Sequence, residues 1–323
     1  MPHAARPLIP REYRLALLAI LLGLAVFAFS IAAALAGEMR TLQVGGVARS
    51  WYLHAPGGLK PGAPLVFVLH GAGGSGQRAV RQYGWQALAD AEGFVVVGPD
   101  AATPFPDRPA DFRTNPRVWN DGSQRGGRHV RSSDDSALVA AMMELLVRTH
   151  GIDRSRVYVT GFSSGASMTQ RLGQEMAGRI AAIAPVAGIM IPLAGELPRP
   201  LPVLYISGDA DPLNPVAGGD VAMPWGGSFR KEPLQRLVER WRDLDGCTGA
   251  PAIATAPSLK IRTWSACRGG VEVQYVLVQD HGHVWPGNDA RSAGRWTGPV
   301  NRHAYDATAK AWAFLRHWRL PAS

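Results

Sequence analysis

Cysteine is nearly absent from this sequence, because only Cys247 and Cys267 occur among its 323 residues. Two cysteines cannot make a structural zinc site by themselves, since such a site takes four ligands. In an exported protein an even pair favours one disulfide, which here would close a loop of about 20 residues. The alternative for this pair is two free, buried thiols.

Sequence patterns of nucleic-acid, phosphate and metal binding are also missing. The formal net charge is +9, but the arginines are scattered and form no stripe interleaved with aromatic residues, so we expect no nucleic-acid partner. The glycine-rich stretch at 70–74 has no G-x-G-x-x-G pattern and no Lys-Ser/Thr pair after it, which disfavours a phosphate loop. No carboxylate cluster has metal-ligand spacing with the histidines, so we expect no metal and no organic cofactor.

Charged residues are missing from Leu15 to Ala36, a stretch of 22 residues that follows three arginines. The stretch ends in Ala34-Leu35-Ala36, which fits the small-x-small site of signal peptidase. We therefore expect residues 1–36 to be a signal peptide and the protein to be secreted or periplasmic. The alternative is an uncleaved anchor, because this stretch is long enough to span a bilayer. Only in that case do we expect the protein to be attached to a membrane.

Residues 37–323 have the composition of one globular domain, with 46% hydrophobic and 18% charged residues in the whole chain. Several apolar runs lack polar alternation, as is typical of parallel strands covered on both faces; they lie at 65–69, 94–97, 157–159, 180–183 and 203–206. The alternating residues at 271–275 suit a strand nearer an edge. Helical spacing of apolar residues appears at 138–146, 168–176 and 304–318. The pattern predicts an α/β fold, an open and mostly parallel sheet with helices on both faces.

Two segments, 101–132 and 215–228, show no regular periodicity. Functional residues of such sheets sit on loops at the carboxyl ends of the strands, and long irregular segments are often functional. We expect both segments to rise above that edge, where they either wall a substrate pocket or simply cover the surface.

Gly161-Phe162-Ser163-Ser164-Gly165 matches the pattern G-x-S-x-G. It follows an apolar strand directly and opens an amphipathic helix, which is the setting of a nucleophile elbow. The tight turn demands small flanking residues and places the hydroxyl of Ser163 at a helix N-terminus, where negative charge is favoured. Ser163 is therefore the predicted nucleophile. An ordinary helix cap at Ser163, or Ser164 as the nucleophile, is the alternative.

A serine nucleophile needs donors for the oxyanion and a base for its proton. His70-Gly71-Ala72-Gly73-Gly74 follows a strand and resembles the loop that supplies one oxyanion donor, so we expect the N–H groups of Ala72 and Ser164 to form the hole. Two acids, Asp209 and Asp211, follow the strand at 203–206. Two bases, His281 and His283, follow the strand at 271–278. Position alone leaves both pairs open, although the order Ser, Asp, His is that of the α/β-hydrolase fold.

The chain resembles the polyhydroxybutyrate depolymerase and feruloyl esterase (LpqC-like) family of α/β-hydrolases from about residue 42 to 318. The matching stretches are 70–71, 119–122, 134–135, 156–166, 208–211 and 282–287, and the two cysteines also match. The resemblance implies a catalytic triad of Ser163, Asp211 and His283. Trp119 and Trp285 are candidates for the pocket wall, with core packing as the alternative, and His70 is a further pocket candidate.

The resemblance implies a serine carboxylesterase that acts on a small or oligomeric ester, such as a hydroxybutyrate oligomer, a feruloyl ester or an acetylated sugar. No Ser/Thr-rich linker or added binding domain is present, so we expect soluble substrates rather than an insoluble polymer. A peptidase on the same fold is one alternative. An inactive α/β-hydrolase that serves as an exported binding protein is the other, although all three triad positions are filled. The oligomeric state has no sequence signal.

Overall fold

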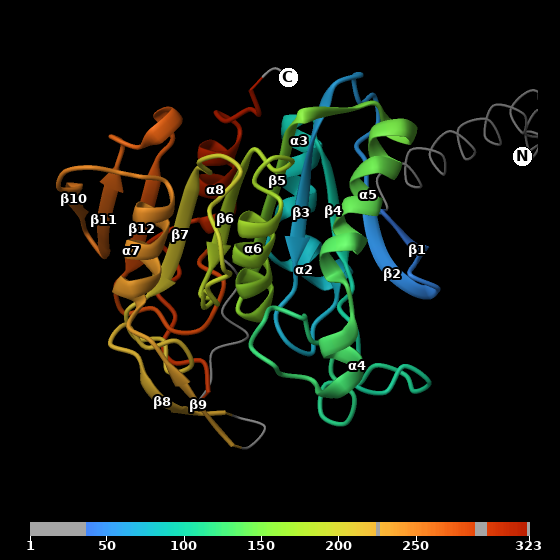
Figure 1. Ribbon diagram of the computed structural model, residues 1–323, viewed down its shortest axis with the longest axis horizontal. Coiled ribbons are helices and arrows are strands. Elements are labelled where there is room, and N and C mark those ends of the chain that lie inside the picture. The colour runs from blue at the N-terminus through green and yellow to red at the C-terminus, as the bar shows by residue number, and fades with distance from the viewer. Residues whose placement is uncertain (1–36, 224–226, 288–295, 322–323) are drawn as a thin grey trace, which may run out of the picture.

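The computed structural model describes residues 37–321, apart from 224–226 and 288–295. Within these residues one ten-stranded sheet runs across the molecule (Figure 1). Its order is β1 (Glu38–Val44), β2 (Val47–His54), β4 (Val95–Pro99), β3 (Ala63–Leu69), β5 (Ile152–Phe162), β6 (Ala182–Val186), β7 (Val203–Gly208), β12 (Val273–Val278), β11 (Leu259–Trp264) and β10 (Ala252–Ala256). The six neighbouring strands from β4 to β12 in this order are parallel to one another. At each edge two more strands are added by antiparallel pairing, β2 and β1 on one side and β11 and β10 on the other.

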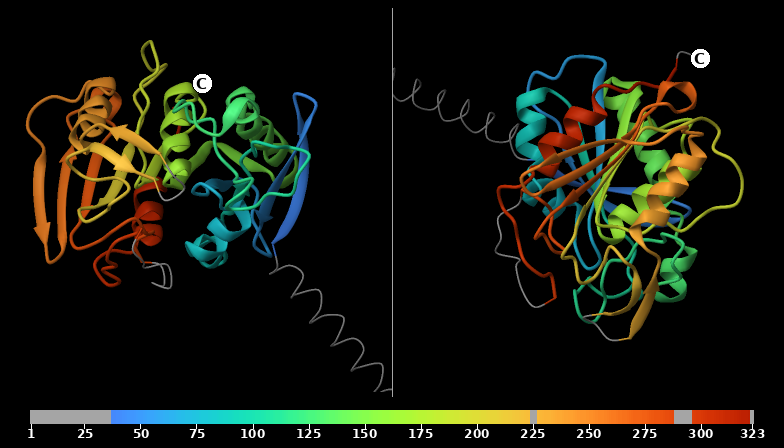
Figure 2. Two further views of the ribbon diagram at one scale, coloured as in Figure 1. Left: turned by 90° about the horizontal axis from the view of Figure 1, so that it is seen from below. Right: turned by 90° about the vertical axis from the view of Figure 1, so that its left-hand side faces the viewer.

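Helices cover both faces of this sheet, as Figure 2 shows from below. One layer holds α5 (Asp135–His150), α6 (Ser164–Glu175) and α7 (Leu234–Leu244), and the other holds α2 (Gly76–Gln82), α3 (Trp85–Glu92) and α8 (Ala307–Leu315). Side chains alternate along a strand, so Phe67 of β3 enters the first core and Val66 enters the second. Both faces are therefore shielded from water, which explains why the parallel strands carry apolar runs.

The predicted α/β architecture is confirmed, with differences at the edges. The last helix is shorter than 304–318, and β12 is the third strand from its edge, because β11 and β10 extend the sheet beyond it. The segment 101–132 contains α4 (Gly127–Ser132), and the segment 215–228 contributes to a hairpin of β8 (Gly219–Ala222) and β9 (Ser228–Lys231). Both lie at the lower end of Figure 1, where the parallel strands end.

The predicted disulfide is present between Cys247 and Cys267. It joins the segment after α7 to the short helix η1 (Arg268–Gly270) and encloses the antiparallel pair β10–β11. The predicted signal peptide or anchor at 1–36 lies outside the described residues. Among those that are described, no helix has the length and apolar character needed to cross a membrane.

Candidate active site

Ser163 stands at the sharp turn between β5 and α6, in a backbone conformation that a non-glycine residue rarely adopts. Its φ is 55° and its ψ is −119°. The turn is fixed by hydrogen bonds, since Ser163 N–H donates to Val186 O at 3.0 Å and Ser167 N–H donates to Ser163 O at 3.0 Å. Conformations of this kind cost about 1–3 kcal/mol and tend to cluster at functional sites.

The two glycines of the pentapeptide are required by close backbone contacts. A Cβ at Gly161 would lie 2.6 Å from Gly165 O, and a Cβ at Gly165 would lie 2.3 Å from Leu69 O. No real Cβ approaches backbone so closely. The motif therefore lets α6 leave β5 directly beside β3, with the serine hydroxyl at the carboxyl edge of the sheet.

His283 lies between Ser163 and Asp211. Its Nε2 is 2.8 Å from Ser163 Oγ, and its Nδ1 is 2.7 Å from Asp211 Oδ2. An ionised carboxylate only accepts hydrogen bonds, so Nδ1 carries the proton and Nε2 is left to accept from the serine hydroxyl. Three residues that follow β5, β7 and β12 in the chain thus form one continuous line at the end of the sheet.

Asp211 is held by backbone as well as by the imidazole. It is 2% exposed, and its Oδ1 accepts hydrogen bonds from the N–H groups of Leu213 and Asn214, both at 2.8 Å. Burial by itself would raise the pKa of Asp211, but His283 and these two N–H groups outweigh it and hold the pKa below its usual value. Asp211 is therefore a fixed carboxylate at neutral pH.

The alternative acid and base have other partners. Asp209 Oδ1 accepts from Asp280 N–H at 2.7 Å, which links the loop after β7 to the loop after β12. His281 Nε2 lies 3.0 Å from Val284 O, and its Nδ1 accepts from Asn301 N–H at 3.2 Å. Burial lowers the pKa of His281. Both side chains shape the loops that carry Asp211 and His283.

The loop after β3, at 70–74, lies against the nucleophile. A Cβ added to Gly71 would be 3.5 Å from Ser163 Cβ. The His70 ring joins this loop to the segment after β4, because its Nδ1 donates to Gly71 O at 2.7 Å and its Nε2 accepts from Ala101 N–H at 3.0 Å. Burial lowers the pKa of His70 to about 4, so the ring is neutral and both bonds persist at neutral pH.

The two predicted oxyanion donors flank this contact. Ala72 lies in the loop next to Gly71, and Ser164 is the first residue of α6. The first N–H groups of a helix have no partner within the helix, so the Ser164 amide is free to bind an anion. The placement is consistent with the oxyanion role expected for both amides.

The three pocket candidates lie in the interior rather than on an open surface. His70, Trp119 and Trp285 are each 2% exposed or less. Trp119 Nε1 donates to His70 O at 2.8 Å, and Trp285 Nε1 donates to Thr308 Oγ1 at 2.9 Å. For both tryptophans the structure favours the packing alternative, in which Trp119 packs against the 70–74 loop and Trp285 anchors its own loop to α8.

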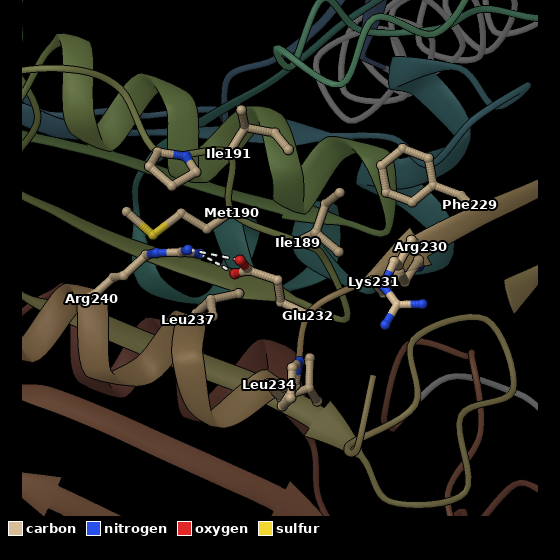
Figure 3. A pocket seen from close by; sticks show the side chains of 12 residues that line it. Ile189, Met190, Ile191, Phe229, Arg230, Lys231, Glu232, Leu234, Leu237 and Arg240 are labelled. Carbon is tan, nitrogen blue, oxygen red and sulfur yellow. Dashed lines mark hydrogen bonds and ion pairs between the residues drawn. The ribbon is translucent and has the colours of Figure 1, made fainter. Parts of the chain in front are cut away.

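Sequence reasoning missed two features, an aromatic ring next to His283 and a pocket lined in part by β9. The half-buried Phe162 ring lies 4.8 Å from the His283 ring, measured between centroids. The sequence signal for Phe162 is its position as the variable residue between Gly161 and Ser163 in the pentapeptide. A pocket of about 190 Å³ opens between the segment after β6, β9 and α7 (Figure 3). Its walls include Ile189, Met190 and Phe229. No sequence pattern marks this pocket, because its walls come from irregular segments far apart in the chain.

The segment 101–132 meets the β8–β9 hairpin near this pocket. The Arg125 guanidinium lies over the Phe229 ring of β9 at 5.8 Å, and it also pairs with Asp121. In the part of the chain that the structure describes, no group of three or more His, Cys, Asp or Glu side chains is placed to hold a metal ion.

The fold and this site define an esterase of the α/β-hydrolase fold, and the comparisons with known proteins agree. The family model described as esterase PHB (polyhydroxybutyrate) depolymerase matches residues 48–223, and the chain belongs to that family. The chain is thus similar to carboxylic ester hydrolases named acetylxylan esterase, polyhydroxyalkanoate depolymerase and feruloyl esterase.

The relatives fit this class. The bifunctional acetylxylan esterase/xylanase XynS20E of Neocallimastix patriciarum is 25% identical over 268 residues, which are 79% of this chain but only 35% of that protein. Poly(3-hydroxyalkanoate) depolymerase C of Paucimonas lemoignei is 29% identical, over 75% of this chain and 61% of its own length. Among solved structures, the acetyl xylan esterase from Aspergillus awamori has the same fold, with a TM-score of 0.58 at 15% identity over 87% of this chain and 99% of that one.

Proposed function

We propose that this protein is an exported serine esterase in which Ser163 is the nucleophile, His283 the base and Asp211 the acid. The observation that carries the proposal is the unbroken line of hydrogen bonds from Ser163 Oγ through the His283 ring to Asp211, at 2.8 and 2.7 Å. The strained serine and the adjoining 70–74 loop support the same assignment. Residues 37–323 form the esterase domain in this proposal, and residues 1–36 serve as the export signal.

The geometry accounts for each proton transfer. His283 Nε2 takes the hydroxyl proton as Ser163 Oγ attacks the ester carbonyl, and Asp211 stabilises the imidazolium that forms. The amides of Ala72 and Ser164 bind the oxyanion. The imidazolium then protonates the leaving alcohol, and the neutral ring activates water against the acyl-enzyme.

The proposed substrates are small or oligomeric esters of hydroxyalkanoic acids or of acetylated or feruloylated carbohydrates. The names of the relatives carry this range. We propose that the mostly apolar pocket beside β9 holds a group attached to the reacting ester. A pocket of about 190 Å³ suits a soluble fragment.

Ser163→Ala tests the proposal, with Ser136→Ala on the exposed side of α5 as the matched control. We expect Ser163→Ala to lose hydrolysis of p-nitrophenyl acetate and labelling by a fluorophosphonate probe, with an unchanged melting temperature. The control should keep both. Undiminished turnover by Ser163→Ala would refute the assignment, and a wild-type protein that neither turns over esters nor accepts the probe would favour an inactive binding protein.

A further inference from the structure

The hairpin β8–β9 reaches the acid of the triad through one lysine. Lys231, the last residue of β9, is partly buried, and its ammonium group donates a hydrogen bond to Leu213 O. The same ammonium group lies 3.5 Å from Asn214 Oδ1. Lys231 also lines the pocket of Figure 3, next to Phe229 and Glu232.

The carbonyl that Lys231 binds belongs to the peptide group whose N–H binds the acid. Leu213 C=O and Asn214 N–H are the two ends of one peptide unit, and that N–H donates to Asp211 Oδ1 at 2.8 Å. Hydrogen bonds in a chain polarise one another, so a cation on the carbonyl makes the N–H a stronger donor. The result is a chain from ammonium through peptide to carboxylate.

Lysine is rare here, which makes its use at this position informative. Of the 34 basic residues four are lysines, and the other three, Lys60, Lys260 and Lys310, are exposed. A compact ammonium group can bind a single carbonyl in a narrow space, whereas a guanidinium group presents a wide planar fork. Burying a cation is costly unless it is partnered, so the placement of Lys231 calls for an explanation.

We propose that Lys231 is a positioning residue of the esterase reaction, which holds the 211–214 turn so that Asp211 stays aligned with His283. This inference rests on the proposed triad. Lys231 acts through the turn and makes no contact with the reacting atoms in the proposal.

The charges around Lys231 come from three elements besides β9. Asp211 favours the charged ammonium, as does Asp121 from the 101–132 segment, whereas Arg125 opposes it. Arg230 of β9 is exposed, and Glu232, the residue after β9, pairs with Arg240 of α7. Burial is the largest effect and lowers the pKa of Lys231 to about 8. The ammonium group is therefore charged at neutral pH and loses its proton in mildly alkaline solution.

The turn has further anchors, so removing Lys231 should weaken its alignment without unfolding it. Asn214 is buried, and its Nδ2 donates to Tyr205 Oη at 3.1 Å and to Gly188 O at 3.3 Å. These bonds do not involve Lys231. We accordingly expect a loss of rate rather than a loss of structure.

Lys231→Met is the first test, with Lys260→Met on β11 as the control. With p-nitrophenyl acetate we expect kcat to fall about tenfold and KM to stay within about twofold, because a charge-assisted bond to the acid's turn is lost. The wild-type kcat should decline above about pH 8 as the ammonium group deprotonates, and this decline should be absent in Lys231→Met. If the role of Lys231 were purely structural, its replacement would leave the alkaline decline of kcat in place.

Chemical rescue is the second test. In Lys231→Cys the new thiol is unique, because Cys247 and Cys267 are joined. Its thiolate displaces bromide from 2-bromoethylamine and gives an S-aminoethyl side chain with an ammonium group at nearly the same reach as lysine. We expect this adduct to regain most of the lost kcat, and a methylthio adduct made with methyl methanethiosulfonate to regain none.

Three outcomes would overturn the inference. The first is a wild-type kcat in Lys231→Met, and the second is an equal rate for the charged and neutral adducts of Lys231→Cys. The third is unfolding of both Lys231→Met and Lys231→Cys, which would assign Lys231 to stability alone. Each is distinct from failure of the proposed triad, which would show as an active Ser163→Ala.

Discussion

Asp211→Asn is a sharp test of the triad because the substitution keeps the shape of the side chain and changes only which atoms donate. In the wild type, Oδ1 accepts from two N–H groups and Oδ2 accepts from His283 Nδ1. An asparagine has one oxygen, which must stay where the two backbone donors point. Its NH₂ group then faces Nδ1 of the ring, and two donors cannot share that contact.

The imidazole avoids two facing donors if it carries its proton on Nε2 instead of Nδ1. A protonated Nε2 can no longer accept the proton of Ser163 Oγ. The corresponding substitution in Ser-His-Asp proteases lowers kcat by about 10⁴. We expect a similar loss here, which corresponds to about 5.4 kcal/mol of transition-state stabilisation.

The pH dependence of stability gives a second readout for Asp211→Asn. Because the folded protein holds the pKa of Asp211 below its usual value, the ionised carboxylate stabilises the wild type above the unfolded pKa of about 4. That stabilisation is lost as the pH falls through the folded pKa. The difference in melting temperature between wild type and variant should therefore be largest near neutral pH and should narrow in acid.

The assay is kcat/KM for p-nitrophenyl acetate at pH 7, with Asp209→Asn as the control. Asp209 binds the N–H of Asp280, so its replacement should affect the loop and leave most activity intact. If Asp211→Asn stays within tenfold of the wild type, or if Asp209→Asn is the more damaging of the two, the assigned acid is wrong.

Two further predictions concern stability. Replacing Cys247 and Cys267 by serine should lower the free energy of unfolding by about 3 kcal/mol, because the disulfide closes a 20-residue separation, and urea denaturation with and without reductant on the wild type should give the same difference. Asp245 is fully buried, and burial raises its pKa to about 7. Its ionisation therefore opposes folding as the pH rises from about 4 to about 7, so the stability of Asp245→Asn relative to the wild type should increase over that range. If the difference between the denaturation midpoints of variant and wild type is the same at pH 5 and at pH 8, this prediction is wrong.

The sequence predicted the centre of the sheet better than its edges. Strands such as β3 and β4 are buried on both faces, and this produces apolar runs that are easy to recognise. The edge strand β10 is exposed along its whole length, and its sequence, Ala252–Ala256, is short and weakly patterned. Its place in the sheet comes from pairing with β11, which periodicity does not reveal.

The turn that carries Ser163 was predictable because close backbone contacts leave little choice of residue on either side of it. The choices between Asp209 and Asp211, and between His281 and His283, were open from position alone, because the members of each pair stand two residues apart on a loop. Which member faces the serine depends on turns such as the one at Asp280, whose φ is 53°. The resemblance to known esterases favoured the pair that the structure brings to Ser163, and the geometry supplies the reason.

The line of hydrogen bonds from Ser163 to Asp211 and the pocket beside β9 are built in different ways, and this explains why the proposed chemistry could be predicted in more detail than the substrate. Ser163 depends on Gly161 and Gly165, where a single added Cβ would collide with backbone. The pocket depends on side chains such as Ile189 and Phe229, which come from segments far apart in the chain. Lys231 belongs to both, since it lines the pocket and binds the turn of Asp211. A substrate group that moves β9 would therefore also move the support of the acid, which gives the hairpin a direct physical route to the rate of the reaction.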